Sequence, residues 1–239
     1  MRKALLTVLA TVTSICYAHD PLHDLYPNVK CAFTPSQYEQ ILMTKIRDRT
    51  TDRVSYRDAA HKLGALLVNK VIECLPTTSP TIQTPLAPFV GRTLSKPVEL
   101  VSIMRSGDAL VEVFMDHFPD APISKILVQR DEETAKANFK YMKLSPTIAS
   151  DRPVVITEPM LATGGTLDTV ITRLTEKGVK EENIIVASVC VAPEGLRALF
   201  ESHPKVQIVI TALDERLNEK KYIVPGLGDF GDRYFGTEK

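Results

Sequence analysis

The chain repeats one local pattern: a short apolar run, a loop of small residues, and then apolar residues at helical spacing. Residues 154–157 form a β-branched run, which is typical of a buried strand. The loop over residues 158–166 contains two adjacent glycines, and apolar residues then recur at helical spacing, namely Leu167, Val170, Ile171 and Leu174. Such strand–loop–helix units predict an α/β fold whose parallel sheet is flanked by helices.

The loop after residues 154–157 has the composition of a phosphate-binding loop. A strand, a loop of small residues and a helix start leave several backbone N–H groups pointing into one concavity, where the helix dipole favours an anion. Glu158 stands at the strand end, beside whatever carries that phosphate. Taken alone, the Thr163–Thr166 loop fits an ordinary strand-to-helix connection better than a ligand site, so the functional interpretation depends on the other segments.

Two further predicted strands end in an arginine. The run over residues 98–104 leads into Arg105 and a helix face that begins at Ala109, and the run over residues 126–130 ends at Arg130. An arginine fork binds phosphate oxygens and keeps its charge, although a lone arginine is more commonly a solvated surface residue. Because open α/β sheets bind ligands at the carboxyl ends of their strands, the three strand ends together indicate one phosphate site.

The C-terminal segment over residues 221–237 is rich in glycine. Four glycines and a proline predict neither a helix nor a plain strand, and such a loop exposes N–H and C=O groups that can read the edge of a flat heterocycle. Tyr222, Phe230 and Tyr234 could add ring faces. Taken alone, the segment also fits a glycine-rich tail.

These segments carry a family resemblance. EPMLATGGT, SIMRSG, KILVQRDEET and KYIVPGLGDFGDRYFG together resemble uracil phosphoribosyltransferases, particularly the eukaryotic-type sequences, from about Tyr26 to the C-terminus. The resemblance implies a type I phosphoribosyltransferase fold, with a parallel sheet, a C-terminal hood and a hairpin arm. The implied reaction converts uracil and 5-phosphoribosyl pyrophosphate (PRPP) to UMP and pyrophosphate, a step of pyrimidine salvage, with Mg²⁺ as cofactor.

The resemblance also assigns roles to residues. Arg105, next to Ser106 and Gly107, would hold the pyrophosphate, and the catalytic residues would be Arg105 and Asp229. The PRPP-binding residues would be Arg105, Arg130, Glu158, Pro159, Met160, Leu161, Ala162, Thr163, Gly164, Gly165, Thr166 and Asp229. The uracil-binding residues would be Tyr222, Ile223, Gly228, Asp229 and Phe230, with the uracil edge read by the backbone.

The chemistry of these residue types agrees with that reaction. The anomeric carbon parts from pyrophosphate with oxocarbenium character, so the protein has to orient the reactants and stabilise the leaving charge. Mg²⁺ prefers phosphate oxygens, water and one or two carboxylates, so we expect no dedicated metal site in the protein. Asp229 is a candidate for steering the uracil proton, although a turn aspartate that bonds its own loop is the alternative.

Three positions depart from the family pattern. Glu158 stands where the family has aspartate, which shifts the carboxylate by about 1 Å and can cost about 100-fold in rate. Ser106 replaces an alanine, and Arg216 stands where the family usually has glycine, so Arg216 would be strained if that glycine had a positive φ. Two alternatives therefore stay open: a catalytically impaired nucleotide-binding or regulatory homologue, and the same fold acting on another base.

Composition and the N-terminus set broader limits. The net charge of zero indicates neither nucleic acid nor membrane as a partner, and four widely spaced cysteines indicate reduced thiols and no zinc site. We expect a leader or extension over residues 1–25 and one domain over residues 26–239. Residues 1–18 resemble a signal peptide, yet PRPP is an intracellular metabolite, so we expect a cytoplasmic protein, with export or an organelle as the alternative.

The remaining secondary structure can be predicted only approximately. Ser36 with Glu39, and Ser55 with Asp58, fit capping boxes that open two helices. Five prolines over residues 76–97 predict an arm or hairpin, which in the family helps to make subunit contacts. Strands are expected over residues 184–191 and 206–211, with a helix over residues 193–202 between them. The resemblance also implies a homo-oligomer, dimer or tetramer, and GTP as an activator, which is known for some members.

Overall fold

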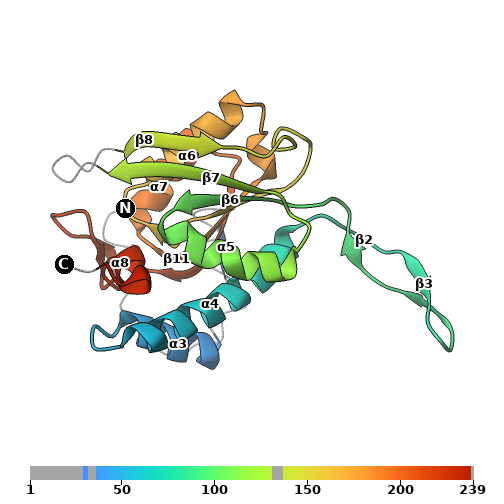
Figure 1. Cartoon of the computed structure of the whole chain (residues 1–239), viewed down its shortest axis with the longest axis horizontal. Coiled ribbons are helices and arrows are strands. Elements are labelled where there is room, and N and C mark those ends of the chain that lie inside the picture. The colour runs from blue at the N-terminus through green and yellow to red at the C-terminus, as the bar shows by residue number, and fades with distance from the viewer. Residues whose placement is uncertain (1–28, 32–35, 131–136, 238–239) are drawn as a thin grey trace, which may run out of the picture.

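The computed structural model describes residues 29–31, 36–130 and 137–237, and the side chains of residues 29–31 and 130 lie outside what it describes. The expected leader over residues 1–25 lies outside the described residues. An eight-stranded sheet forms the centre (Figure 1). In spatial order its strands are β1 (Val29–Cys31), β12 (Gln207–Leu213), β11 (Ile184–Val191), β9 (Val154–Thr157), β6 (Glu99–Met104), β7 (Ile123–Arg130) and β8 (Ala137–Lys143), and β10 (Met160–Leu161) pairs with β11.

The predicted parallel sheet is confirmed, with one exception. All neighbours pair in parallel except β8, which runs antiparallel to β7 along one edge. Strand β8 is not predicted from the sequence, because exposed and half-buried positions mix along it and it contains no buried apolar run. Every residue of β9 and of β11 is buried, as expected for strands covered on both faces.

Helices cover both faces of the sheet and separate two cores. One face packs against α3 (Gln37–Arg47), α4 (Arg53–Cys74) and α5 (Ser106–His117), and the other against α6 (Gly165–Glu176) and α7 (Pro193–Ser202). Successive residues of a strand serve different cores: Val155 belongs to the first, whereas Val154 and Ile156 belong to the second. A short 3₁₀ turn, η1 (Glu181–Asn183), precedes β11.

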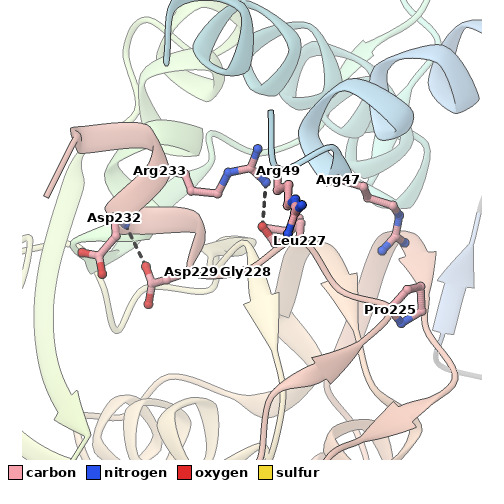
Figure 2. A pocket seen from close by; sticks show the side chains of 8 residues that line it. All are labelled: Arg47, Arg49, Pro225, Leu227, Gly228, Asp229, Asp232 and Arg233. Atoms are coloured by element: carbon pink, nitrogen blue, oxygen red, sulfur yellow. Dashed lines mark hydrogen bonds between the residues drawn. The ribbon is translucent and has the colours of Figure 1, made fainter. Parts of the chain in front are cut away.

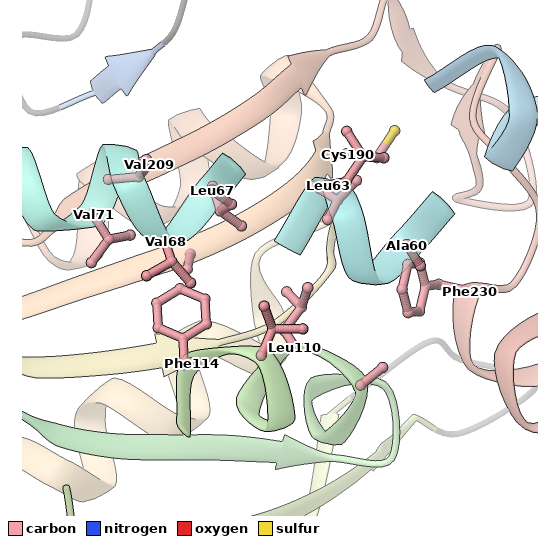
Figure 3. Packing of buried hydrophobic residues seen from close by; sticks show 14 of the residues in the cluster. Ala60, Leu63, Leu67, Val68, Val71, Leu110, Phe114, Cys190, Val209 and Phe230 are labelled. Atoms are coloured by element: carbon pink, nitrogen blue, oxygen red, sulfur yellow. The ribbon is translucent and has the colours of Figure 1, made fainter. Parts of the chain in front are cut away.

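The long helix α4 carries much of the first core. Leu63, Leu67 and Val71 are buried along α4, and the ring of Phe114 of α5 lies below this helix beside Val68 in Figure 3. The capping box at Ser36 and Glu39 is confirmed. The box proposed at Ser55 is wrong, because Asp52 caps α4 three residues earlier and accepts a hydrogen bond from the Ser55 N–H.

The proline-rich segment forms the expected hairpin arm, which projects from the body of the molecule (Figure 1). Its two antiparallel ladders join β2 (Thr77–Thr78) to β5 (Thr93–Leu94) and β3 (Thr81–Gln83) to β4 (Pro88–Val90). The arm exposes large apolar side chains, namely Ile82, Leu86, Phe89 and Val90. An arm of this kind suits contacts with another chain.

The C-terminal segment is more regular than its glycines suggest. The expectation of neither helix nor strand is wrong, because β14 (Ile223–Val224) pairs with β13 (Arg216–Leu217) and α8 (Phe230–Phe235) follows. We call residues 216–237 the hood. Arg216 lies in an extended strand, and Lys221 is the only non-glycine residue of the described chain with a positive φ. The backbone strain that a positive φ would cause at Arg216 is therefore absent.

Cys74 and Cys190 are free thiols, whereas the side chains of Cys16 and Cys31 lie outside those described. No helix within the described ranges is both long and apolar enough to cross a bilayer.

Candidate active site

The loops after β6 and β9 lie side by side at the carboxyl ends of these neighbouring strands. Ser102 of β6 is in register with Thr157 of β9, so Arg105 and Glu158 both follow at the same edge of the sheet. The Thr157 hydroxyl donates to the Gly107 carbonyl at 3.0 Å, and the Ser106 hydroxyl lies 3.5 Å from Glu158 Oε1. The structure therefore brings together the two segments that the sequence analysis singled out.

The loop over residues 158–166 has the geometry expected of an anion-binding loop. Pro159 accepts hydrogen bonds from β11, Met160 and Leu161 form β10, and the chain then turns at Gly164 with φ of +86°. That left-handed conformation favours glycine and lets α6 begin at Gly165. The N–H groups of the first helical turn have no acceptor within the helix, which leaves them available to an anion.

Glu158 is nearly enclosed. Its side chain belongs to a residue only 8% exposed, and its N–H donates to the Ala187 carbonyl at 3.1 Å. Its Oε1 lies toward the Ser106 hydroxyl of the loop after β6.

Arg105 reaches across to the hood. It precedes α5, its side chain is 54% exposed, and it forms an ion pair with Asp232 at 2.7 Å and a hydrogen bond to Thr237 Oγ1 at 2.8 Å. Behind it, Asp108 accepts hydrogen bonds from Ser102 at 2.5 Å and from Lys125 at 2.8 Å, which ties the first turn of α5 to β6 and β7. Arg130 ends β7 at the same edge, and its side chain lies outside what the structure describes.

Besides Asp232, the hood contributes exposed backbone and the carboxylate of Asp229. Gly228 and Asp229 are exposed, whereas Ile223 is buried. Asp229 caps α8, since its Oδ1 accepts from the Asp232 N–H at 2.8 Å, so the alternative of a turn aspartate is what the structure contains. A capping carboxylate at an exposed position can still face a ligand with its other oxygen.

The expected ring faces are only partly available. Phe230 is 1% exposed, and its ring packs edge-on against Tyr56 and stacks on Tyr234, with centroids 5.6 and 5.9 Å away. Its ring therefore anchors α8 to the core and cannot cover a base, while its backbone remains a candidate. Tyr222 is 56% exposed and stays a candidate for covering one.

Sequence reasoning missed the side chains that hold the hood. Arg47 at the end of α3 pairs with Asp214 after β12, and Arg233 donates to the carbonyls of Leu227 and Asp48. Asp214 follows a predicted strand, and this position could have identified it as a candidate site residue. No pattern in the sequence identifies Arg47. The pKa of Asp214 would rise on burial, yet its bonds to Arg47, together with those from Cys190 and Gly226, keep it below the usual value.

A pocket of about 400 Å³ lies between the α3–α4 connection and the hood (Figure 2). The hood contributes Gly228, Asp229, Asp232 and Arg233 to the lining, and the end of α3 with the connection after it contributes Arg47 and Arg49. The lining includes no residue of the loop over 158–166. The pocket therefore borders the hood and is not lined by that loop.

Gly107 is expected to tolerate no side chain. A Cβ at this position would lie 2.3 Å from the Thr157 carbonyl oxygen, at the closest approach of the two loops. We expect Gly107→Ala to destabilise the fold by about 1–3 kcal/mol, as overpacking does. Urea denaturation measures it, with Gly165→Ala as the control, where the nearest atom is 3.9 Å away. Equal stability of the two variants would contradict the described approach of the loops.

Comparisons with known proteins point to one family. The family model described as "Uracil phosphoribosyltransferase" matches residues 33–237. A uracil phosphoribosyltransferase of Dictyostelium discoideum is 42% identical over 198 residues, which cover 82% of this chain and 91% of that protein. Another, from Dictyoglomus turgidum, is 41% identical over 197 residues and 94% of its length.

A solved structure is also similar. The AQ2163 protein from Aquifex aeolicus superposes with a TM-score of 0.76 at 29% identity, covering 85% of this chain and 96% of that one. The family match spans the loops after β6 and β9 as well as the hood. The chain therefore belongs to the uracil phosphoribosyltransferase family, whose members are pentosyltransferases of nucleotide salvage.

Proposed function

We propose that the chain transfers the phosphoribosyl group of PRPP to uracil, giving UMP and pyrophosphate, at the edge of the sheet where β6 and β9 end. The observation that carries the proposal is the approach of the Arg105 loop to Glu158 beneath the hood, with the Ser106 hydroxyl 3.5 Å from the carboxylate. In this proposal the loop over residues 158–166 receives a phosphate, Arg105 is the cation for the leaving anion, and the exposed backbone of the hood reads the base.

In this proposal the loop over residues 158–166 binds the ribose 5-phosphate group. The N–H groups of residues 163–166 receive the 5-phosphate, and Glu158 accepts hydrogen bonds from the ribose hydroxyls. Arg105 contacts the pyrophosphate, and Arg130, at the end of the adjacent strand, contributes from the same side. The half-exposed position of Arg105 leaves its guanidinium accessible to that ligand.

Uracil would lie against the hood. Its alternating carbonyl and N–H edge suits pairing with backbone groups at Ile223, Gly228 and Phe230, with Tyr222 close by. Asp229 would take part in moving the proton of the attacking ring nitrogen. Its exposure and its fixed place at the start of α8 support that role.

The reaction then depends on orientation and charge. The bond from the anomeric carbon to pyrophosphate breaks as the uracil nitrogen attacks, and Arg105 stabilises the charge that leaves. Within the described ranges no three His, Cys, Asp or Glu side chains gather as a metal site. In this proposal Mg²⁺ is held mainly by phosphate oxygens and water, where it would neutralise part of the pyrophosphate charge.

The proposal also covers the oligomeric state, activation by GTP and the cellular location, which the family resemblance implies. The apolar residues of the arm, such as Phe89, support a homo-oligomer, which sedimentation can measure. GTP as an activator is tested by adding it to the assay. Since PRPP is an intracellular metabolite, we place the protein in the cytoplasm, with export or an organelle as the alternative if residues 1–18 act as a signal peptide.

The second candidate is a nucleotide-binding homologue with impaired turnover, which the glutamate at position 158 favours. Uracil-dependent release of pyrophosphate from PRPP, with Mg²⁺, separates the two. Turnover supports the enzyme, whereas binding of UMP without turnover supports the homologue.

Substitution of Glu158 tests the ribose contact. We expect Glu158→Gln to weaken PRPP binding clearly more than Glu158→Asp, because the amide removes the charge and the aspartate only shortens the side chain by one methylene. Misplacement of a positioned group can cost about 100-fold. Isothermal titration with PRPP measures the affinities, and equal values for the wild type and both variants would show that the carboxylate is not a ligand.

A further inference from the structure

Both backbone polar groups of Gly226 are bound by charged side chains from distant parts of the chain. The Gly226 N–H donates to Asp214 Oδ2 at 2.7 Å, and its carbonyl accepts from Arg47 Nη1 at 2.7 Å. Arg47 and Asp214 also bind each other through two contacts, Nη2 to Oδ1 at 2.5 Å and Nη1 to Oδ2 at 2.9 Å. We call these two side chains the Gly226 clamp.

The clamp is mostly buried, and Asp214 makes further hydrogen bonds. The Asp214 side chain is 2% exposed and that of Arg47 is 25% exposed. Asp214 follows β12 directly, its N–H donates to the Val191 carbonyl at 2.8 Å, and the Cys190 thiol donates to its Oδ2 at 3.2 Å. Buried ion pairs contribute little net stability, and their best-attested use is to fix one geometry among several.

The clamped residue lies in the segment that would read the base. Gly226 stands between Ile223 and Gly228, whose backbone groups the proposed function assigns to uracil. Its φ is +62°, and a Cβ would lie 2.2 Å from the Ile223 carbonyl oxygen. Because the turn is this tight, a shift of Gly226 has to move Ile223 and the residues toward Gly228 with it.

The pyrophosphate side of the site is held by other contacts. Arg105 is bonded to Asp232 and Thr237, and the Glu158 N–H is bonded to β11. Arg47 and Asp214 bind Gly226 directly, whereas they reach Arg105 only through the rest of the hood and the loop over residues 158–166 only through Cys190, whose N–H donates to the Pro159 carbonyl. The clamp can therefore affect one substrate more than the other.

We propose that Arg47 and Asp214 are positioning residues that fix the uracil-reading backbone through Gly226 and so set the KM for uracil, with little influence on the KM for PRPP. The inference rests on the proposed function. If the ion pair were purely structural, its loss would lower the Tm and would change the KM for uracil and the KM for PRPP by the same factor.

The test measures kcat and both KM values for the full chain and for Asp214→Asn, Arg47→Lys and Arg47→Ala. We expect the KM for uracil to rise roughly tenfold or more, as a small displacement of a positioned group allows, while that for PRPP stays within about twofold. Added guanidinium ion should lower the uracil KM of Arg47→Ala and leave that of Asp214→Asn unchanged.

The chain offers a matched control in a second ion pair. Arg152 and Glu99, with side chains 29% and 0% exposed, pair at 3.1 Å at the amino end of β6, away from the strand ends that carry the site. We expect Glu99→Gln to lower the Tm and leave the uracil KM unchanged.

The outcomes separate the two claims. A wild-type chain that releases no pyrophosphate with uracil overturns the proposed function and this inference with it. An active wild type whose clamp variants raise both KM values alike, or lower only the Tm as Glu99→Gln does, overturns the inference alone. If Asp214→Asn does not fold, Arg47→Lys decides, because lysine keeps the charge and loses the bidentate fork.

Discussion

Cytosine should react at least about 10⁴-fold more slowly than uracil in kcat/KM. Cytosine replaces a carbonyl with an amino group and an N–H with a bare ring nitrogen, so backbone donors at the hood would face donors. A site built for hydrogen bonds rejects such a mismatch by about 10⁴ or more. Competition of uracil, 5-fluorouracil and cytosine for nucleotide formation measures the ratio.

The halogenated base is the control in that competition. It keeps the hydrogen-bonding edge of uracil, so its kcat/KM should stay close to that of uracil. Comparable rates with cytosine would show that Ile223 and Gly228 do not read the base. That outcome would leave the family membership unaffected and move base selection to another part of the site.

Arg105→Ala should leave the fold intact and remove most of the activity. The side chain is half exposed and its ion pair with Asp232 contributes at most about 1 kcal/mol to stability. Loss of one preorganised charge donor at a leaving group costs about 2–4 kcal/mol, or roughly 30- to 1000-fold in kcat. Steady-state kinetics at saturating PRPP and uracil measure the effect, with the Tm as a check on folding.

Asp232→Asn separates the two partners of that ion pair. It weakens the link between Arg105 and the hood but keeps the guanidinium that would contact pyrophosphate. We expect its kcat to stay far above that of Arg105→Ala. If both variants lose activity equally, the ion pair and not the charge of Arg105 is what the reaction needs.

The strand–loop–helix units could be predicted because their signals are local. The buried run of β9, the glycine turn and the apolar face of α6 all lie within residues 154–174, and the structure has each of them where the sequence indicates. The arm followed equally directly from its prolines. These features need no knowledge of any distant residue.

The remaining features depend on contacts between distant segments. The ring of Phe230 is buried because Tyr56 of α4 lies against it, and Arg47 reaches a carbonyl 179 positions away in the sequence. Strand β8 pairs at an edge, where a half-exposed strand leaves only a weak pattern. The capping error at Ser55 has a different cause, since Asp52 is an equally good N-cap and the two lie within one turn of each other.

The ion pair between Arg105 and Asp232 makes the hood an internal competitor for the anion that Arg105 would bind. A ligand that uses the same N–H groups has to displace the carboxylate from the guanidinium, so its apparent affinity is lowered by the strength of that pair. Because both partners are partly exposed, the pair is worth at most about 1 kcal/mol, and the reduction stays below roughly fivefold. The arginine is thus kept extended across the site, at a small loss of affinity, in a conformation that an incoming anion can take over.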